Sequence, residues 1–280
     1  GVIEALQYEF MRNAWAAGLL ASIACGAIGT LVVLNRKVFI TAGIAHAAYG
    51  GVGLGYFLHA NPVWTAVGFS IAAALGMGAI ERSTRQRSDT LIGVLWALGM
   101  AVGIILIDLT EGYKADLMSF LFGSILTVPA SDLVYMAVLD VLILVVVILF
   151  HKELLAISFD ESFAVVQNVA VERLYYAVVV MIAVTVVMLM RVVGLIMVIA
   201  LLTMPAAIAV MFAKDLRRAM ALAAVLGMGF TGLGLWLSYD FDLTSGATII
   251  LVATTAYLGS LWAQTHRRKS GWKEGPDSGT

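Results

Sequence analysis

Nine long apolar stretches divide this chain, and they constrain its fold more than any other feature of the sequence. Each has close to the ~17–25 residues that an α-helix needs to cross the hydrocarbon core of a bilayer. Backbone amides in lipid must be hydrogen-bonded within their own segment, so such stretches predict helices. We expect an all-α, polytopic transmembrane bundle of about eight to nine spans. The stretches cover residues 13–34, 38–58, 63–80, 91–107, 133–150, 174–190, 192–212, 219–238 and 246–263.

The composition excludes a soluble fold. Hydrophobic residues make up 61% of the 280 residues, and charged residues only 12%, about half of the ~25% that is usual in soluble domains. A single cysteine, Cys25, excludes a disulfide framework and a cysteine zinc cluster. The net charge of −1 gives no indication of nucleic-acid binding.

Basic residues are concentrated in alternate connections between the stretches. If residues 35–37 face the cytoplasm, all but three of the 17 Lys and Arg residues lie on that side, as the positive-inside bias requires. The opposite face then carries mainly acidic residues. Such a face favours cations or a basic docking partner, or it reflects only the need of outer loops for polar residues. The three exceptions are Arg12, Lys114 and Arg191.

This orientation requires that Leu117–Ala130 does not cross the membrane. The segment has too few apolar residues before Pro129 for a span and is typical of a re-entrant or interfacial piece. If it did cross, the span count would change by one. Otherwise we expect one transmembrane domain over residues 1–269 and a disordered cytoplasmic tail over residues 270–280, which is rich in Gly, Pro, Ser and charges.

The sequence contains no motif for its own energy-yielding chemistry. It has no phosphate-binding P-loop, no His-Glu-x-x-His pair and no Gly-x-Ser-x-Gly elbow. We therefore expect a transport protein and not an enzyme, with no permanently bound cofactor. Its energy would come from a separate subunit or from an ion gradient.

Two polar residues inside the stretches are candidates for an ion pathway. A histidine in a span, such as His46, normally faces a bundle interior or a wet cavity, and imidazole is a good ligand for transition metals. Asp140 is the acid deepest in a span, and a carboxylate there is a candidate cation ligand or proton site. Each also has a simpler interpretation, as a side chain hydrogen-bonded to a backbone carbonyl or to a neighbouring helix.

Helix packing and a gate are predicted from small residues and from a proline. Small residues at i+4 spacing let helices approach closely in lipid, so the stripe beside His46 is expected to pack helices. Pro205 removes a backbone donor within the seventh stretch, and kinked spans are where transporters build gates. We place a gate at Met204 and Pro205. The stripe consists of Gly43, Ala47, Gly51 and Gly55.

The longest predicted cytoplasmic loop lies between the fifth and sixth stretches. Ser158 and Glu161 have the spacing of a capping box, which predicts a short helix after Ser158. Phe159, Phe163 and Val166 would then share one face. Such a helix either enters a groove on a partner or lies on the membrane, and its acids argue mildly against the membrane.

Four segments occur in an order that is more specific than any one of them. They are residues 45–55 (AHAAYGGVGLG), 121–126 (LFGSIL), 158–164 (SFDESFA) and 193–207. The last of these segments contains Pro205. With them the chain resembles, from about Gln7 to Trp262, the permease subunit of ATP-binding-cassette importers for zinc, manganese or iron(II).

The resemblance implies a homodimer with a central pathway in a prokaryotic cytoplasmic (inner) membrane. Its partners would be a cytoplasmic ATP-binding-cassette ATPase and an extracytoplasmic metal-binding protein, with no nucleic acid. His46 is implied as a pathway metal ligand, and Asp140 is our weaker second candidate. The segment implied to dock on the ATPase includes Phe159, Asp160, Glu161, Phe163, Ala164 and Val166.

Two positions in the histidine motif and one near the coupling segment differ from the family's pattern. Many members carry Asp four residues before the histidine and Ser immediately before it, where this chain has Ala42 and Ala45. One helical turn would have placed Asp and His on one face, so a two-ligand site is lost. The glycine often found after the coupling segment is replaced near Asn168.

We therefore expect a permease that translocates a divalent transition-metal ion by alternating access, driven by ATP hydrolysis on a partner. The alternative is a secondary transporter or channel that is coupled to an ion or proton gradient through Asp140 and His46.

Overall fold

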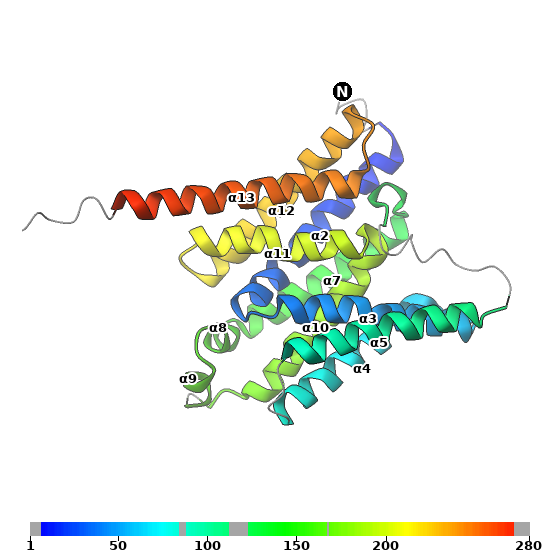
Figure 1. Ribbon diagram of the computed structural model, residues 1–280. Helices are drawn as coiled ribbons and strands as arrows, with labels where there is room; N and C mark the ends of the chain where they lie inside the picture. The colour runs from blue at the N-terminus through cyan, green and yellow to red at the C-terminus, as the bar shows by residue number, and fades with distance from the viewer. Residues whose placement is uncertain (1–6, 84–87, 112–122, 167, 272–280) are drawn as a thin grey trace, which may run out of the picture.

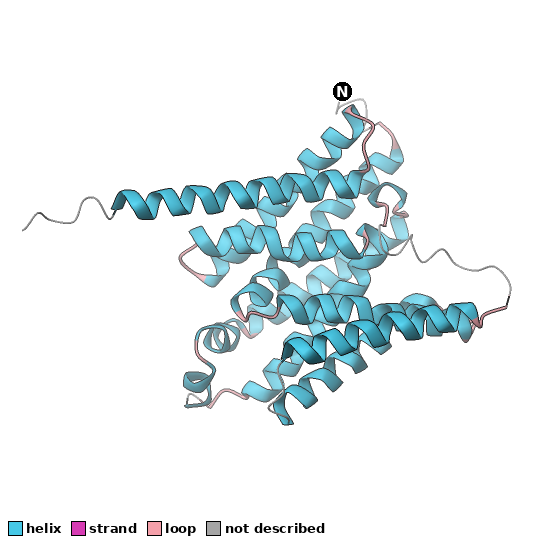
Figure 2. Ribbon diagram, in the orientation of Figure 1, coloured by secondary structure: helices cyan, strands magenta, loops and turns pink. Residues whose placement is uncertain are grey.

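The computed structural model describes residues 7–83, 88–111, 123–166 and 168–271, and every regular element among them is a helix (Figures 1 and 2). The all-α prediction is thereby confirmed. The helices, labelled as in Figure 1, are α2 (Glu9–Leu34), α3 (Val38–Phe57), α4 (Pro62–Ser83), α5 (Ser88–Asp108), η1 (Ile125–Thr127), α7 (Ala130–Leu149), α8 (His151–Phe159), α9 (Glu161–Val166), α10 (Val171–Val193), α11 (Leu195–Phe212), α12 (Leu216–Asp240) and α13 (Ser245–Gly271).

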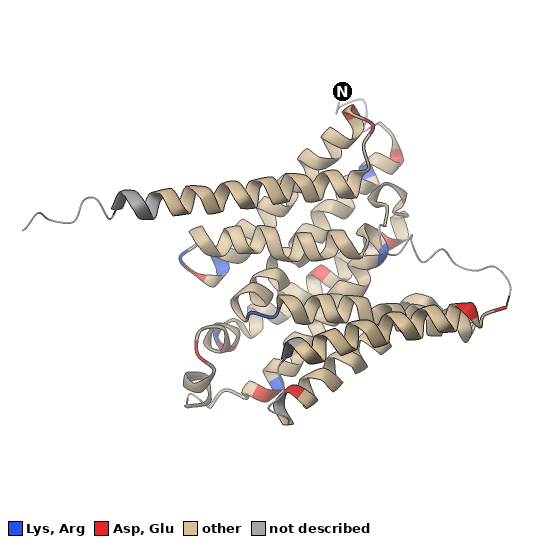
Figure 3. Ribbon diagram, in the orientation of Figure 1, with Lys and Arg blue, Asp and Glu red and all other residues tan. Residues whose placement is uncertain are grey.

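Within the described part of the chain, 9 helices are long and apolar enough to cross a membrane. Each overlaps one of the nine predicted stretches, so the higher of the two expected counts is the one observed. Figure 3 shows most of the charged residues near the two ends of the bundle, with long uncharged lengths of helix between them. This distribution is what a bilayer requires, because a charge at the centre of a span costs several kcal/mol.

The spans form two groups that α10 connects. In one group α2 packs against α7, α11 and α12, and in the other α3 lies against α4 and α5. Helix α10 contacts α4 and α3 on one side and α11 on the other. In Figure 1, α13 runs along one edge of the molecule and α4 and α5 run along the opposite edge.

Close packing of α2 and α3 depends on glycines. A Cβ atom on Gly26 of α2 would lie 2.6 Å from the backbone nitrogen of Ala224 in α12, and one on Gly51 of α3 would lie 2.5 Å from the Cα atom of Ala66 in α4. No hydrophobic drive brings helices together in lipid, so such backbone contact supplies the attraction instead.

The connections gather at two opposite ends of the bundle. Helices α8 and α9 lie at one end, and η1 lies at the other (Figure 1). Of the predicted re-entrant segment, residues 117–122 are outside the described residues. The rest forms η1 and an extended approach to α7, fixed where Asn13 Nδ2 donates to the Val128 carbonyl at 3.2 Å. Residues 272–280 of the predicted tail are also outside the described residues.

Candidate metal pathway and coupling segment

His46 lies in the middle of α3, with 8% of its surface exposed. Its Nδ1 atom is 2.8 Å from the carbonyl oxygen of Ala42, one helical turn earlier. A carbonyl only accepts hydrogen bonds, so Nδ1 carries the proton and donates it. In a neutral imidazole with this tautomer the lone pair is on Nε2, which is the form of histidine that binds a metal ion.

Trp96 of α5 covers this imidazole. The two rings stack with their centroids 3.6 Å apart and their planes 21° apart, and 40% of Trp96 is exposed. The stack fixes the plane of the histidine ring, while the Ala42 carbonyl fixes its tautomer. Sequence reasoning missed Trp96, because one aromatic residue in an apolar stretch carries no signal that distinguishes it from ordinary packing.

The small-residue stripe of α3 faces two different helices. Gly51 and Gly55 are placed against the start of α4, at Ala66 and Pro62. Gly43 lies against Ile92 of α5. Ala47, between them, meets Gly99 of α5. The stripe therefore holds α4 and α5 close to the helix that carries His46.

The structure does not bring Asp140 together with His46. Asp140 lies on α7, whose main neighbours are α2, α8 and α10, and it is near Cys25 of α2. Only 5% of the residue is exposed, and its Oδ2 atom has no hydrogen-bond partner among the described residues. That part of the chain also contains no group of three or more His, Cys, Asp or Glu side chains that could hold a metal ion. Within the described residues, His46 and Asp140 therefore lie apart and do not form one site.

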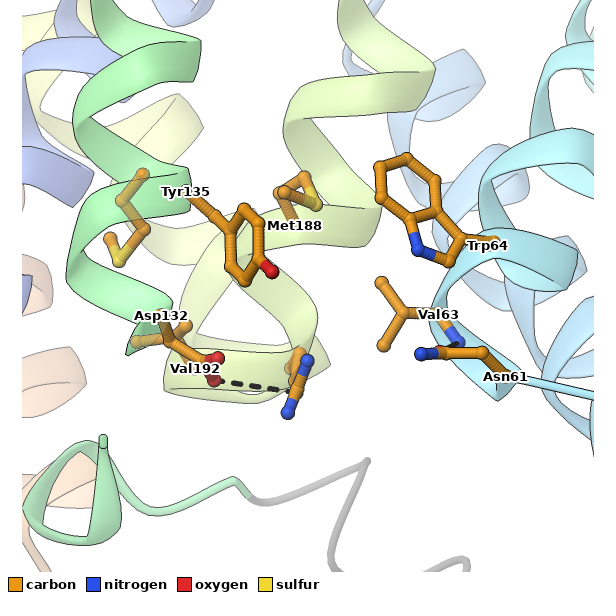
Figure 4. Close-up of a pocket in the computed structure, with 9 residues that line it drawn as sticks. Asn61, Val63, Trp64, Asp132, Tyr135, Met188 and Val192 are labelled. Atoms are coloured by element: carbon orange, nitrogen blue, oxygen red, sulfur yellow. Dashed lines mark hydrogen bonds and ion pairs between the residues drawn. The ribbon is translucent and has the colours of Figure 1, made fainter. Parts of the chain in front are cut away.

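At the η1 end, two neighbouring cavities of about 60 and 500 Å3 share Asn61, Val63 and Arg191 among their lining residues. In the smaller one, Arg191 Nε of α10 lies 3.3 Å from Asp132 Oδ2 of α7 (Figure 4). The lining is completed by side chains that face one another across the gap, with Trp64 on α4 opposite Tyr135 and Met188 on α7 and α10. The positive charge of Arg191 at this end is thus offset by the buried carboxylate of Asp132.

The predicted coupling helix is in fact two helices. Ser158 lies inside α8, which ends at Phe159, and α9 begins at Glu161. The capping-box prediction at Ser158 is wrong, because α8 continues through that residue and Asp160 caps the next helix instead, with Oδ1 accepting from the Ser162 N–H at 2.9 Å. The prediction that Phe159 shares one helical face with Val166 fails for the same reason.

Two residues of this segment expose apolar side chains. Phe159 is 73% exposed and Val166 is 79% exposed, whereas Ala164 is fully buried against the bundle. Nothing is described of the side chains of Glu161 and Phe163.

Asn168, where the family glycine is replaced, has a φ of 57°. Asparagine is among the few residues other than glycine that adopt this left-handed conformation readily. The turn from α9 into α10 is therefore retained despite the substitution.

The predicted gate residues lie inside α11. Pro205 is within the helix, and the sulfur of Met204 lies 3.6 Å from Thr254 Oγ1 of α13. The Thr254 hydroxyl donates its one proton to the Ile250 carbonyl at 2.7 Å. A proline at this point leaves the preceding turn without one backbone bond. Met204 therefore contacts α13 next to the turn of α11 that Pro205 weakens.

A bundle with nine helices long and apolar enough to cross a membrane, and a histidine buried inside one of them, defines a polytopic membrane protein of the permease class. The model of the ABC 3 transport family matches residues 7–264, and the chain belongs to this family. It is a multi-pass transport subunit of a metal transport system in the cell membrane of a prokaryote, and ATP hydrolysis takes place on a separate subunit.

Relatives of known origin and one solved structure support the assignment. The chain is 61% identical to an uncharacterised membrane protein of Synechocystis over 93% of this chain and 92% of the relative. It is 34% identical to the manganese transport system membrane protein MntC of Listeria monocytogenes, with 90% of each chain covered. It also matches the structure of PsaBC from Streptococcus pneumoniae in complex with Fab, with a TM-score of 0.83, 32% identity, and 92% and 93% of the two chains covered.

Proposed function

We propose that this chain is the permease subunit of an ATP-driven importer for a divalent transition-metal ion. The observation that carries the proposal is the full-length similarity to the manganese permease MntC, joined to a buried histidine with a free Nε2 atom. Manganese is the first ion to test, and zinc and iron(II) follow.

His46 is the proposed pathway ligand. A divalent transition metal takes four or more ligands, and His46 belongs to no group of three or more His, Cys, Asp or Glu side chains among the described residues. Trp96, over the ring, is partly exposed on the protomer surface. A second copy of the chain is therefore proposed to cover this surface and contribute its own His46, with water completing the coordination. Asp140 is the second pathway residue of the proposal, supported by its unpartnered buried oxygen.

The proposed mechanism is alternating access. An ATP-binding-cassette ATPase would dock on the exposed Phe159 and Val166, and an extracytoplasmic metal-binding protein would deliver the ion at the η1 end. Binding and hydrolysis of ATP would favour one orientation of the bundle over the other, which requires different affinities for the ligands in the two states.

The test is manganese uptake by the permease and its ATPase reconstituted together in liposomes. We expect ATP-dependent uptake that His46→Ala reduces by about tenfold or more, since loss of a ligand or its support typically costs 10–100-fold in affinity. His266→Ala, an exposed histidine on α13, is the matched control and should transport normally. Asp140→Asn tests the second residue in the same assay. Uptake driven fully by a proton gradient without ATP would contradict the proposal and favour the secondary transporter.

A further inference from the structure

A side-chain hydrogen bond joins the cytoplasmic hairpin to the turn between α2 and α3. Asn35 Nδ2 donates to Ser158 Oγ at 3.0 Å, from the end of α2 to the end of α8. The same Nδ2 atom donates to the Leu31 carbonyl at 2.8 Å, and Ser158 Oγ donates to the Leu154 carbonyl at 2.7 Å. Both Nδ2 protons and the hydroxyl proton are thus used, so Ser158 is the acceptor in the bond between the two helices.

The turn that receives this bond leads directly into the helix that carries His46. Lys37, two residues after Asn35, is the N-cap of α3. Its Nζ atom lies 3.5 Å from Glu81 Oε1 of α4 and 4.7 Å from the ring centre of Tyr175 of α10. Tyr175 in turn donates to Glu81 Oε2 at 2.8 Å. These contacts attach the start of α3 to α4 and α10. A displacement of Asn35 therefore acts on the start of α3 and on the two helices attached to it.

Helix α8 packs on the core through Leu154, but the packing is interrupted beside the bond. A cavity of about 390 Å3 lies between the turn and the ends of α8 and α10, and Asn35, Ser158 and Phe159 are among its lining residues. Where side chains are not in contact, motion is not transmitted by packing. The hydrogen bond crosses this space and provides a direct connection.

We propose that the Asn35–Ser158 hydrogen bond passes movement of the α8–α9 hairpin to α3 and so to His46. Both residues are positioning residues and touch neither the metal nor ATP. This inference rests on the proposed function, because it requires a separate ATPase that moves the hairpin. To the proposed function it adds Asn35 and Ser158, the two residues that connect ATP hydrolysis on the partner to the metal pathway at His46.

The test is the number of metal ions transported per ATP hydrolysed, measured with the permease and its ATPase in liposomes. Ser158→Ala should lower this ratio by about threefold or more, as expected for loss of one hydrogen bond, while ATP hydrolysis continues. Ser158→Thr keeps the hydroxyl and should restore the ratio. Ser260→Ala is the matched control, because Ser260 makes the same type of bond to a carbonyl four residues earlier, at 2.8 Å, with no bond to another helix.

A purely structural role would change the amount of assembled complex but not the ratio. An unchanged ratio in Ser158→Ala, with normal ATP-driven uptake by the unmodified protein, would overturn the proposed link alone. An equal fall in Ser260→Ala would also overturn it. Absence of ATP-driven uptake by the unmodified protein would overturn the proposed function and the link together. The effects of Asn35→Ala and Ser158→Ala should be non-additive, since both remove one bond; additive effects would contradict the link.

Discussion

The imidazole of His46 and the indole of Trp96 lie face to face, with ring centroids 3.6 Å apart, on two helices that approach each other through Ala47 and Gly99. The small residues thus bring the backbones close enough for a histidine and a tryptophan to stack. The other constraint on the imidazole comes from its own helix, where Nδ1 lies 2.8 Å from the Ala42 carbonyl.

Replacing Trp96 should weaken metal handling without removing the ligand. Trp96→Leu frees the imidazole ring to rotate, and we expect the KM for metal uptake to rise about tenfold, the scale of losing an outer partner of a metal ligand. Trp96→Phe keeps an aromatic face and should stay close to the unmodified protein. Trp262→Leu is the control, since Trp262 makes its ring contact with His266 on α13. Equal KM values for all three variants would show that the stack does not position His46.

Ala42→Asp should restore a two-ligand arrangement. The new carboxylate would lie one helical turn before His46, and oxygen ligands suit manganese better than imidazole alone. We expect tighter manganese binding, with a gain for manganese relative to zinc, measured by competition uptake. The gain should vanish in Ala42→Asp/His46→Ala. Ala42→Asn, similar in shape and uncharged, is the control, and an equal gain with Asn would contradict a role for the charge.

Gly194→Ala should destabilise the η1 end of the bundle. Gly194 joins α10 to α11 with φ 80° and ψ 155°, a region that is essentially restricted to glycine. Its backbone also lies directly against Gly123, which has a φ of 55°. We expect a loss of about 1–3 kcal/mol, measured as a lower apparent Tm in detergent. Gly229→Ala is the control, because nothing lies within 4 Å of a Cβ there. Equal Tm values for the two variants would exclude strain at Gly194.

Asp132→Asn should leave the charge of Arg191 uncompensated beside the cavities at the η1 end. Because an exposed positive charge repels the incoming cation, the KM for metal should rise at low ionic strength and recover as salt screens the charge. Asp132→Asn/Arg191→Gln removes both charges and should transport normally at either ionic strength. A rise in KM that is independent of salt, or that persists in the double variant, would show that the pair acts through structure instead.

The spans could be predicted from the sequence because the bilayer fixes their length. Each stretch, including the one around His46, needed only hydropathy and the requirement for internal hydrogen bonds. The break between α8 and α9 could not be predicted in the same way. Ser158 and Asp160 are both good N-cap residues, and the choice between them depended on how far α8 extends from the bundle.

Of the two stacked residues of the candidate site, only His46 could be predicted from the sequence. His46 was found because a histidine in a span is costly, whereas Trp96 is compatible with any apolar environment. The partners of Ser158 and Lys37 were also hidden. Asn35 and Ser158 are 123 residues apart, and Lys37 and Glu81 are 44 residues apart. No local pattern connects such positions, so only the folded helices bring them together.

The most direct measurement compares metal flux through the permease reconstituted alone with flux through the permease and its ATPase in the same liposomes. We predict flux only in the complete complex and only with ATP, because the chain contains no energy-yielding motif and presents its apolar hairpin outside the spans. Full flux through the permease alone, with no second subunit and no ATP, would contradict this prediction.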